Sequence, residues 1–250
     1  MDRALTVGAV VLVMGMLNWS AAEAATVYSN NFETAVGPEL STNFAGGLTI
    51  DRTPTGSRGF LGRNDQSPIL GVGETDVVTL TLNGLAAHNN TTLSFDFYAI
   101  NSLDGYGPGG GTGENYRVAV GGGPTLLNTN FAVHPSSTSQ AYPGSVPTDQ
   151  NPPRTGADEN NSLGYITVFP GLGGDSVYNL SFTFPHSDSS LSVSFTYAGL
   201  QELSDESWGI DNLRVDIDSA AETVPEPGTL LLLGGGLAGL AAIRRHVARN

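Results

Sequence analysis

Two residue types are missing from the 250-residue chain, and each absence excludes several kinds of chemistry. Without cysteine the chain can form no disulfide, no thiolate metal site and no cysteine nucleophile. Without lysine, all ten basic residues are arginines, and phosphate-loop lysines and Schiff-base lysines are excluded. The 24 acidic residues give a formal net charge of −14, which repels the phosphate backbone of nucleic acids. We therefore expect no nucleic-acid partner.

The N-terminus has the parts of a secretory signal peptide. Arg3 supplies a positive charge, Ala4 to Leu17 form an apolar core, and Ala22 and Ala24 fit the small-x-small cleavage pattern. We expect a signal peptide over residues 1–24 and a mature chain that starts at Ala25. An uncleaved anchor helix is the alternative, but the apolar run is short for a membrane span.

The C-terminal residues 222–250 combine three features in a fixed order. Pro225, Glu226 and Pro227 come first, an apolar stretch follows, and Arg244 and Arg245 end it. An apolar helix of about 15 to 20 residues can cross a bilayer, and arginines stay on the cytoplasmic side. We expect a transmembrane helix at about 229–243, with a buried core helix as the alternative.

This order of features resembles the PEP-CTERM sorting signal of Gram-negative bacteria. The resemblance implies insertion into the inner membrane and recognition by an exosortase, a membrane protease-transpeptidase. Processing would release the protein to the cell surface or the exopolysaccharide matrix. On this resemblance Pro225, Glu226 and Pro227 are read by the processing enzyme and have no catalytic role.

The body between the two ends, residues 25–221, shows the period-two alternation of strands with one apolar face. High glycine and proline content also favours strands joined by turns. The clearest segments are 78–82, 93–99, 178–184 and 191–197, and weaker ones are 27–32, 48–52, 116–120, 125–131, 165–169 and 213–217. We expect an all-β fold, an antiparallel jelly-roll-like sandwich of about ten strands.

Two segments interrupt the alternation. Residues 105–113 are rich in glycine and predict a flexible loop. Residues 134–161 include five prolines and form a long connection. Loops of this length are either functional or disordered, and we favour disorder here.

The last predicted strand changes phase near Asp211. Trp208 and Ile210 share one parity, whereas Leu213 and Val215 share the other, which predicts a β-bulge. The acids around this point repel one another unless a cation or hydrogen-bond donors neutralise them. Oxygen ligands without histidine or cysteine suit Ca²⁺.

An acid near the first strand and an Asp-Asn pair in the last strand resemble secreted β-sandwich carbohydrate-binding modules, where such residues commonly hold a structural calcium. The clustered acids suggest a calcium site formed by Glu33, Asp104, Asp205 and Asp211, and the resemblance implies that Glu33 and Asp211 belong to it. The alternative is that these acids are solvated turn residues.

Aromatic side chains in loops are candidates for stacking on sugar rings. Tyr106 and Tyr142 are the best candidates, because they lie in the glycine-rich and proline-rich loops. Tyr116 and Trp208 are better explained as core residues. His88 and His134 are interpreted as lone surface histidines, so a zinc site is disfavoured.

Catalytic arrangements are weak in this sequence. Residues 174–176 resemble the nucleophile block of GDS-type lipases, but the required late Asp-x-x-His is missing. The triad residue types at 186–188 are adjacent and cannot line up as a triad. Glu202, Asp205 and Glu206 lack the spacing that puts glycanase carboxylates on one face. We therefore expect an exported, non-catalytic protein of the cell surface or extracellular matrix. A calcium-stabilised carbohydrate-binding module and a glycan-active enzyme are the alternatives.

Overall fold

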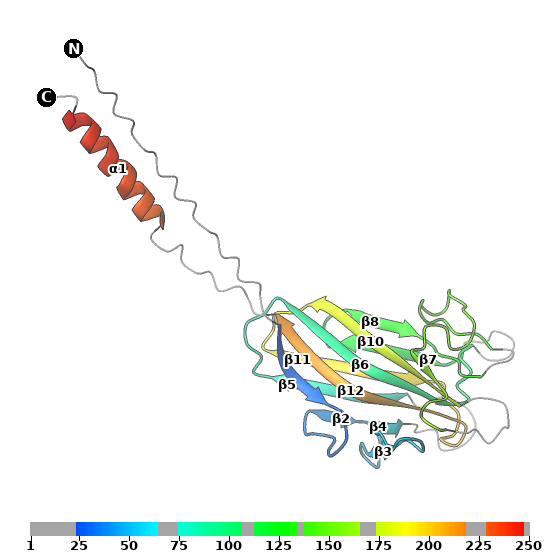
Figure 1. Ribbon diagram of the computed structural model, residues 1–250. Coiled ribbons are helices and arrows are strands. Elements are labelled where there is room, and N and C mark those ends of the chain that lie inside the picture. The colour runs from blue at the N-terminus through cyan, green and yellow to red at the C-terminus, as the bar shows by residue number, and fades with distance from the viewer. Residues whose placement is uncertain are drawn as a thin grey trace.

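The computed structural model describes residues 24–64, 75–106, 113–134, 138–165, 174–218 and 229–247. Within these ranges the chain forms twelve strands and one helix, α1 (Thr229–Val247). The strands build two antiparallel sheets packed face to face (Figure 1). The all-β sandwich expected from the alternation is confirmed.

One sheet has β12 (Glu206–Asp218) near its centre. Its order is β3 (Ile50–Arg52), β4 (Gly59–Asn64), β12, β6 (Asn90–Asn101), β10 (Gly174–Pro185) and β9 (Glu159–Asn160). The first strand, β1 (Ala24–Asn30), pairs with the second half of β12, so that Ala24 lies opposite Asp218. The two ends of the sandwich domain therefore leave it side by side.

The other sheet contains five strands. Their order is β2 (Leu40–Thr42), β5 (Asp76–Asn83), β11 (Ser190–Ala198), β7 (Asn115–Val120) and β8 (Thr125–Thr129). The chain crosses between the sheets after β1, β2, β4, β5, β6, β8, β10 and β11, which is the winding expected of a jelly-roll-like sandwich. The strands β8 and β9 each form one edge of their sheet.

The four clear predicted strands lie inside β5, β6, β10 and β11. The predicted strand 27–32 ends earlier, at Asn30, because Phe32 takes a left-handed backbone with φ of 50°. Strand β4 was not predicted, since its sequence GFLGRN does not alternate. Of the predicted strand 165–169, Tyr165 lies outside any strand and the other residues lie outside the described ranges.

Aromatic rings fill the centre of the sandwich. Phe97 lies 4.4 Å from Tyr116 and 4.5 Å from Phe131 between ring centroids, and Trp208 is fully buried beside them. A fully buried aromatic side chain contributes roughly 1.5–3 kcal/mol by its transfer from water. A smaller cluster on the other face of β6 consists of Phe60, Tyr98, Ile100, Leu163 and Val177.

The long connection after β8 is ordered over residues 138–165, contrary to the expectation of disorder. Gln140 is fully buried at its centre. Its Oε1 accepts hydrogen bonds from the backbone N–H of Ala132 and Arg154 and from the Tyr178 hydroxyl. Its Nε2 donates to the carbonyls of Tyr142 and Thr155. This side chain therefore adds to the backbone hydrogen bonds of the segment, such as those between Gln140 and Asn151.

Candidate functional site

The predicted bulge in β12 is present and positions Asp211. The register against β6 shifts between Asp211 and Arg214, and Asn212 has a φ of 50°. The Asp211 carboxylate accepts hydrogen bonds from the Tyr98 hydroxyl at 2.8 Å and the Asn212 N–H at 2.7 Å. Burial raises the pKa of Asp211, and the nearby Asp96 and Glu33 carboxylates raise it further.

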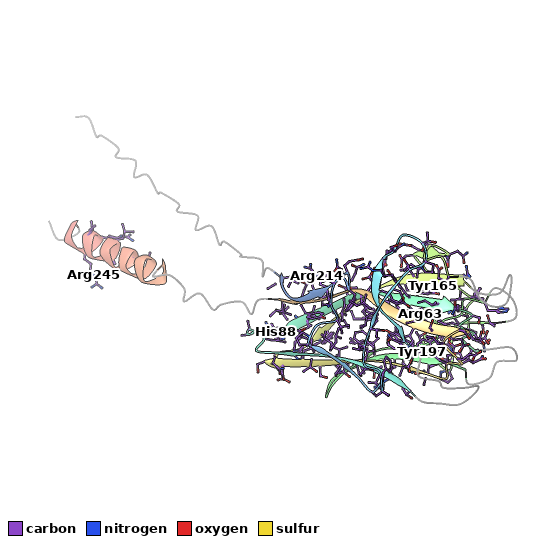
Figure 2. The ribbon with its side chains drawn as sticks, turned by 90° about the horizontal axis from the view of Figure 1, so that it is seen from below. Arg63, His88, Tyr165, Tyr197, Arg214 and Arg245 are labelled. Carbon is purple, nitrogen blue, oxygen red and sulfur yellow. The ribbon has the colours of Figure 1, made fainter. Side chains whose placement is uncertain are left out.

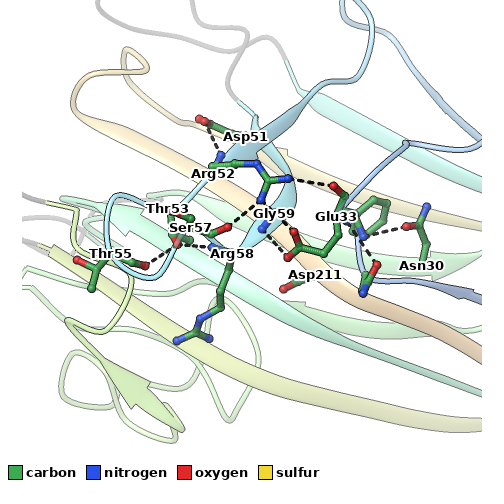
Figure 3. Close-up of polar contacts among 12 residues, drawn as sticks. Asn30, Glu33, Asp51, Arg52, Thr53, Thr55, Ser57, Arg58, Gly59 and Asp211 are labelled. Carbon is green, nitrogen blue, oxygen red and sulfur yellow. Dashed lines mark hydrogen bonds and ion pairs between the residues drawn. The ribbon is translucent and has the colours of Figure 1, made fainter.

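Glu33 lies in the same region, and its oxygens also have protein donors (Figure 3). The Gly59 N–H donates to Oε1 at 2.9 Å, and Arg52 Nη1 donates to Oε2 at 2.9 Å. The Gly59 hydrogen bond and then Arg52 hold the pKa of Glu33 below its usual value. Glycine at position 59 permits this approach, because a Cβ there would lie 2.5 Å from the Phe32 carbonyl oxygen.

Asp104 and Asp205 lie farther along the sheet, near the start of β12. The Ser102 hydroxyl donates to the Asp205 carboxylate and to its carbonyl. Burial raises the pKa of Asp104, His134 lowers it and Asp205 raises it. The described residues contain no group of three or more His, Asp or Glu that could hold a metal ion. The four acids therefore form two separate pairs, and the convergence expected of them as one calcium site is not found.

Two buried carboxyl groups, which the sequence analysis did not single out as a pair, share a hydrogen bond. Glu114 is 4% exposed and Glu206 is 1% exposed. Glu114 accepts from the Tyr197 hydroxyl at 2.6 Å and from the Asp104 N–H at 2.6 Å, and Glu206 accepts from the Gln201 N–H. Burial raises the pKa of both groups, that of Glu114 to about 7. Glycosidases separate their two carboxyl groups across an open cleft, so this closed pair does not have that geometry.

The other catalytic candidates have structural roles. Asp175 is fully buried, and its carboxylate accepts hydrogen bonds from the N–H groups of Leu163, Gly164 and Tyr165. The Ser176 hydroxyl donates to the Asn160 side chain. Asp175 and Ser176, which resemble part of a lipase nucleophile block, therefore hold the end of the long connection against β10 by hydrogen bonds.

His88 is not the lone surface histidine that the sequence suggested. It is 3% exposed, and its Nε2 lies 2.7 Å from Nδ1 of His186. The pair lies towards one end of the sandwich, and Tyr165 and Tyr197 lie towards the other (Figure 2).

The aromatic candidates separate into buried and half-buried residues. Trp208 and Tyr116 are core residues, as expected. Tyr106 is 5% exposed and lines a hollow of about 270 Å³, with Glu114, Asn115 and Asn128. Tyr142 is half-buried, and its ring packs 5.0 Å from Phe131 and 5.2 Å from Tyr178. Of the two tyrosines proposed to bind a ligand, Tyr142 is the more accessible.

Tyr142 lines an open groove of about 890 Å³. The groove lies where the edges of the two sheets meet, between β8 and β10. Strand β9 pairs only with Ser176 and Val177, and the Asn179 N–H donates to the Asp158 carboxylate, so residues 180–182 of β10 have no strand neighbour on this side. The lining is mainly polar; its members are Arg117, Thr125, Leu126, Leu127, Asn128, Tyr142, Pro143, Ser145, Asn179, Leu180, Ser181 and Phe182.

Arg117 differs from the other arginines of the sandwich. Arg52, Arg58, Arg63 and Arg214 each form a salt bridge, at 2.9, 2.7, 3.4 and 2.8 Å. Arg154 donates to the Val133 carbonyl and the Asn161 side chain. The exposed Arg117 donates to the Thr125 hydroxyl at 2.7 Å and has no acidic partner among the described residues. A positive charge without a carboxylate therefore faces the groove of a strongly acidic protein.

The C-terminal signal is described in part. Helix α1 carries the exposed Arg244 and Arg245, whereas Pro225, Glu226 and Pro227 lie outside the described residues, as does Ala22. Ala24, the other predicted cleavage residue, begins β1. No helix in the described ranges, α1 included, is long and apolar enough to span a membrane. The transmembrane expectation for 229–243 is thus not confirmed.

Comparison with protein families identifies the C-terminal signal. The model of the PEP-CTERM protein-sorting motif matches residues 223–245. The chain carries a PEP-CTERM sorting motif. The motif implies an exported protein of a Gram-negative bacterium that an exosortase processes. The matched residues include Pro225 to Pro227, the apolar stretch and the pair Arg244 and Arg245, which are the three features of the predicted signal.

Two solved structures that resemble the sandwich are distant in sequence. A comparison with curated proteins found no significant match. Among solved structures, the K3 adhesin domain of Lys-gingipain from Porphyromonas gingivalis is 14% identical, with 76% of this chain and 98% of that chain covered and a TM-score of 0.40. The CBM22-1 xylan-binding domain of Paenibacillus barcinonensis Xyn10C is 12% identical, with 81% and 100% covered and a TM-score of 0.37.

Proposed function

We propose that the sandwich is a non-catalytic binding domain of the cell surface or extracellular matrix, and that the β8–β10 groove binds an acidic polysaccharide. The observation that carries this proposal is Arg117, an arginine without an acidic partner among the described residues, in an open polar groove. The sorting motif supports the location, because it directs the protein outside the cytoplasm.

The groove offers the groups that recognise sugars. A guanidinium binds a carboxylate with two parallel hydrogen bonds, which suits a uronic acid. Asn128, Asn179 and Ser181 supply amide and hydroxyl groups for sugar hydroxyls, and Tyr142 supplies an aromatic ring. The net charge of −14 repels a densely charged polyanion. We therefore favour a heteropolysaccharide in which uronic acids alternate with neutral sugars.

Calorimetry with xanthan and with carboxyl-reduced xanthan tests this proposal. Both polymers have the same backbone, so the comparison isolates the uronic acid. We expect the full-length protein to bind xanthan and to bind the reduced polymer at least tenfold more weakly. Equal binding of both would contradict the role of Arg117 and leave a neutral-glycan groove, and binding of neither would contradict the glycan proposal. The absence of new reducing ends after incubation would support a non-catalytic domain.

The membrane-anchored precursor is a further part of the proposal. It combines the signal peptide over residues 1–24 with an inner-membrane stage in which the segment at about 229–243 is embedded. Replacing Glu226 by Ala should block processing, so that the protein stays in the membrane fraction instead of reaching the medium or surface. A variant that is released as efficiently as the parent would contradict this order of events.

Calcium stabilisation also remains a proposal. Of the four acids, Glu33 and Asp211 are close enough for Glu33 to raise the pKa of Asp211, but their oxygens already accept hydrogen bonds from protein donors. Calcium would have to displace Arg52 or the Tyr98 hydroxyl to bind there. Millimolar Ca²⁺ should raise the Tm of the parent and not that of Asp211→Asn. An unchanged Tm of the parent on addition of Ca²⁺ would contradict the calcium proposal.

A further inference from the structure

Two histidines from turns far apart in the sequence meet head to head at one end of the sandwich. His88 lies between β5 and β6, and His186 lies between β10 and β11. Their facing nitrogens are 2.7 Å apart, and their ring planes are 25° apart. The backbone joins the same turns, since the His186 N–H donates to the Asn89 carbonyl at 3.0 Å and the Leu85 N–H donates to the Ser189 carbonyl at 2.9 Å.

The hydrogen bonds fix which nitrogen of His88 carries a proton. Its Nδ1 lies 2.6 Å from the Ala86 carbonyl oxygen, which can only accept, so Nδ1 is the protonated nitrogen. The lone pair of Nε2 therefore points at His186. In the neutral pair, His186 Nδ1–H donates to it. A carbonyl that holds the far nitrogen of an imidazole is the support that metal-ligating histidines commonly have.

We propose that His88 and His186 together bind a divalent transition-metal ion such as Cu²⁺ or Zn²⁺. In the bound form the proton of His186 moves from Nδ1 to Nε2 through solvent, which leaves two lone pairs facing the ion and changes no net charge on the rings. Metal–nitrogen bonds of about 2.0–2.1 Å require the two nitrogens to separate to more than about 3 Å. The half-exposed His186 can supply this small displacement, whereas His88 is fixed by the Ala86 carbonyl.

The surroundings favour a cation. The Asp218 carboxylate is near enough to His88 for the two groups to interact electrostatically, and it is fixed by the N–H groups of Asn89 and Asn90. A hollow of about 400 Å³ lined by His186 and Asp188 gives access from solvent. The acidic protein also raises the local concentration of cations. Water would complete the coordination, since the described residues offer no third ligand in a preformed cluster.

Calorimetry and electron paramagnetic resonance of the untagged full-length chain with Cu²⁺ test this site. We expect one tight equivalent of Cu²⁺ with two nitrogen ligands in the spectrum. His186→Asn, a change in an exposed turn, should weaken binding at least tenfold and leave one nitrogen ligand. His88→Ala should do the same, but His88 is buried, so His186→Asn carries the test if the other variant does not fold.

The other two histidines provide the matched control. A chain with both His134→Ala and His246→Ala should keep the affinity and the spectrum of the parent. If His186→Asn binds Cu²⁺ as tightly as the parent, or if the parent binds no saturating equivalent, the proposal is overturned. The outcome is independent of the groove, because xanthan binding should be the same in the parent and in His186→Asn.

Discussion

The centre of the sandwich and the β8–β10 groove both contain polar side chains, but these groups have different partners. In the centre, Trp208 Nε1 donates to Asp76 at 2.9 Å and Tyr197 donates to Glu114, whereas the buried Tyr116 hydroxyl has no hydrogen-bond partner among the described residues. In the groove, Arg117 contacts one hydroxyl and no acid among the described residues. Residue type alone therefore does not mark function here. A charged side chain without a charged partner, such as Arg117, is the better indicator of a binding site.

The largest effect on stability is expected from breaking a central pair. Trp208→Phe removes the donor to Asp76 and leaves a small cavity, so the free energy of unfolding should fall by about 2–4 kcal/mol. Urea denaturation measures this change. Binding of xanthan below the lowered Tm should be unchanged, since Trp208 does not line the groove. The distinction between the two regions would be contradicted if Trp208→Phe were as stable as the parent, or if it folded but no longer bound xanthan.

A smaller effect is expected from pH. Burial raises the pKa of Glu114 from 4.5 to about 7 and raises that of Glu206 as well. A group whose pKa is raised by folding stabilises the folded state. This contribution is fully present below the group's pKa in the unfolded chain, and it is lost as the pH rises through the group's pKa in the folded state. The free energy of unfolding should therefore fall as the pH rises from 4.5 to 7.

Substitution of the pair checks the origin of this dependence. Glu206→Gln keeps a neutral hydrogen-bonding group beside Glu114 and should flatten the pH profile of unfolding. The exposed Glu202→Gln, in the preceding turn, serves as the control and should leave the profile as it is. An unchanged profile in Glu206→Gln would assign the pH dependence to other groups.

The sequence predicted what depends on local pattern. Alternation located β5, β6, β10 and β11, and the change of phase near Asp211 located the bulge. It could not show that Glu114 and Glu206 lie in contact, because Glu114 precedes β7 and Glu206 begins β12, which are strands of different sheets. It missed the order of the long connection for the same reason, since the hydrogen bonds of Gln140 join segments that only tertiary packing brings together.

The sequence predicted only one of the groove residues that the proposal uses. Tyr142 was singled out by its place in a proline-rich loop, and it lines the groove. The sequence pattern did not indicate a binding role for Arg117, because an arginine on a strand is usually an ordinary solvent-exposed residue. Its importance follows from the pairing of β8 with β7 and from the salt bridges that occupy four other arginines.

The affinity of two arginine variants for xanthan tests the central claim most directly. Arg117→Gln and Arg214→Gln remove the same charge from exposed strand positions, and the second breaks a surface ion pair outside the groove. Each should change stability by less than about 1 kcal/mol. We expect Arg117→Gln to weaken binding at least tenfold and Arg214→Gln to bind like the parent. Equal affinities for both variants and the parent would contradict the assignment of the groove.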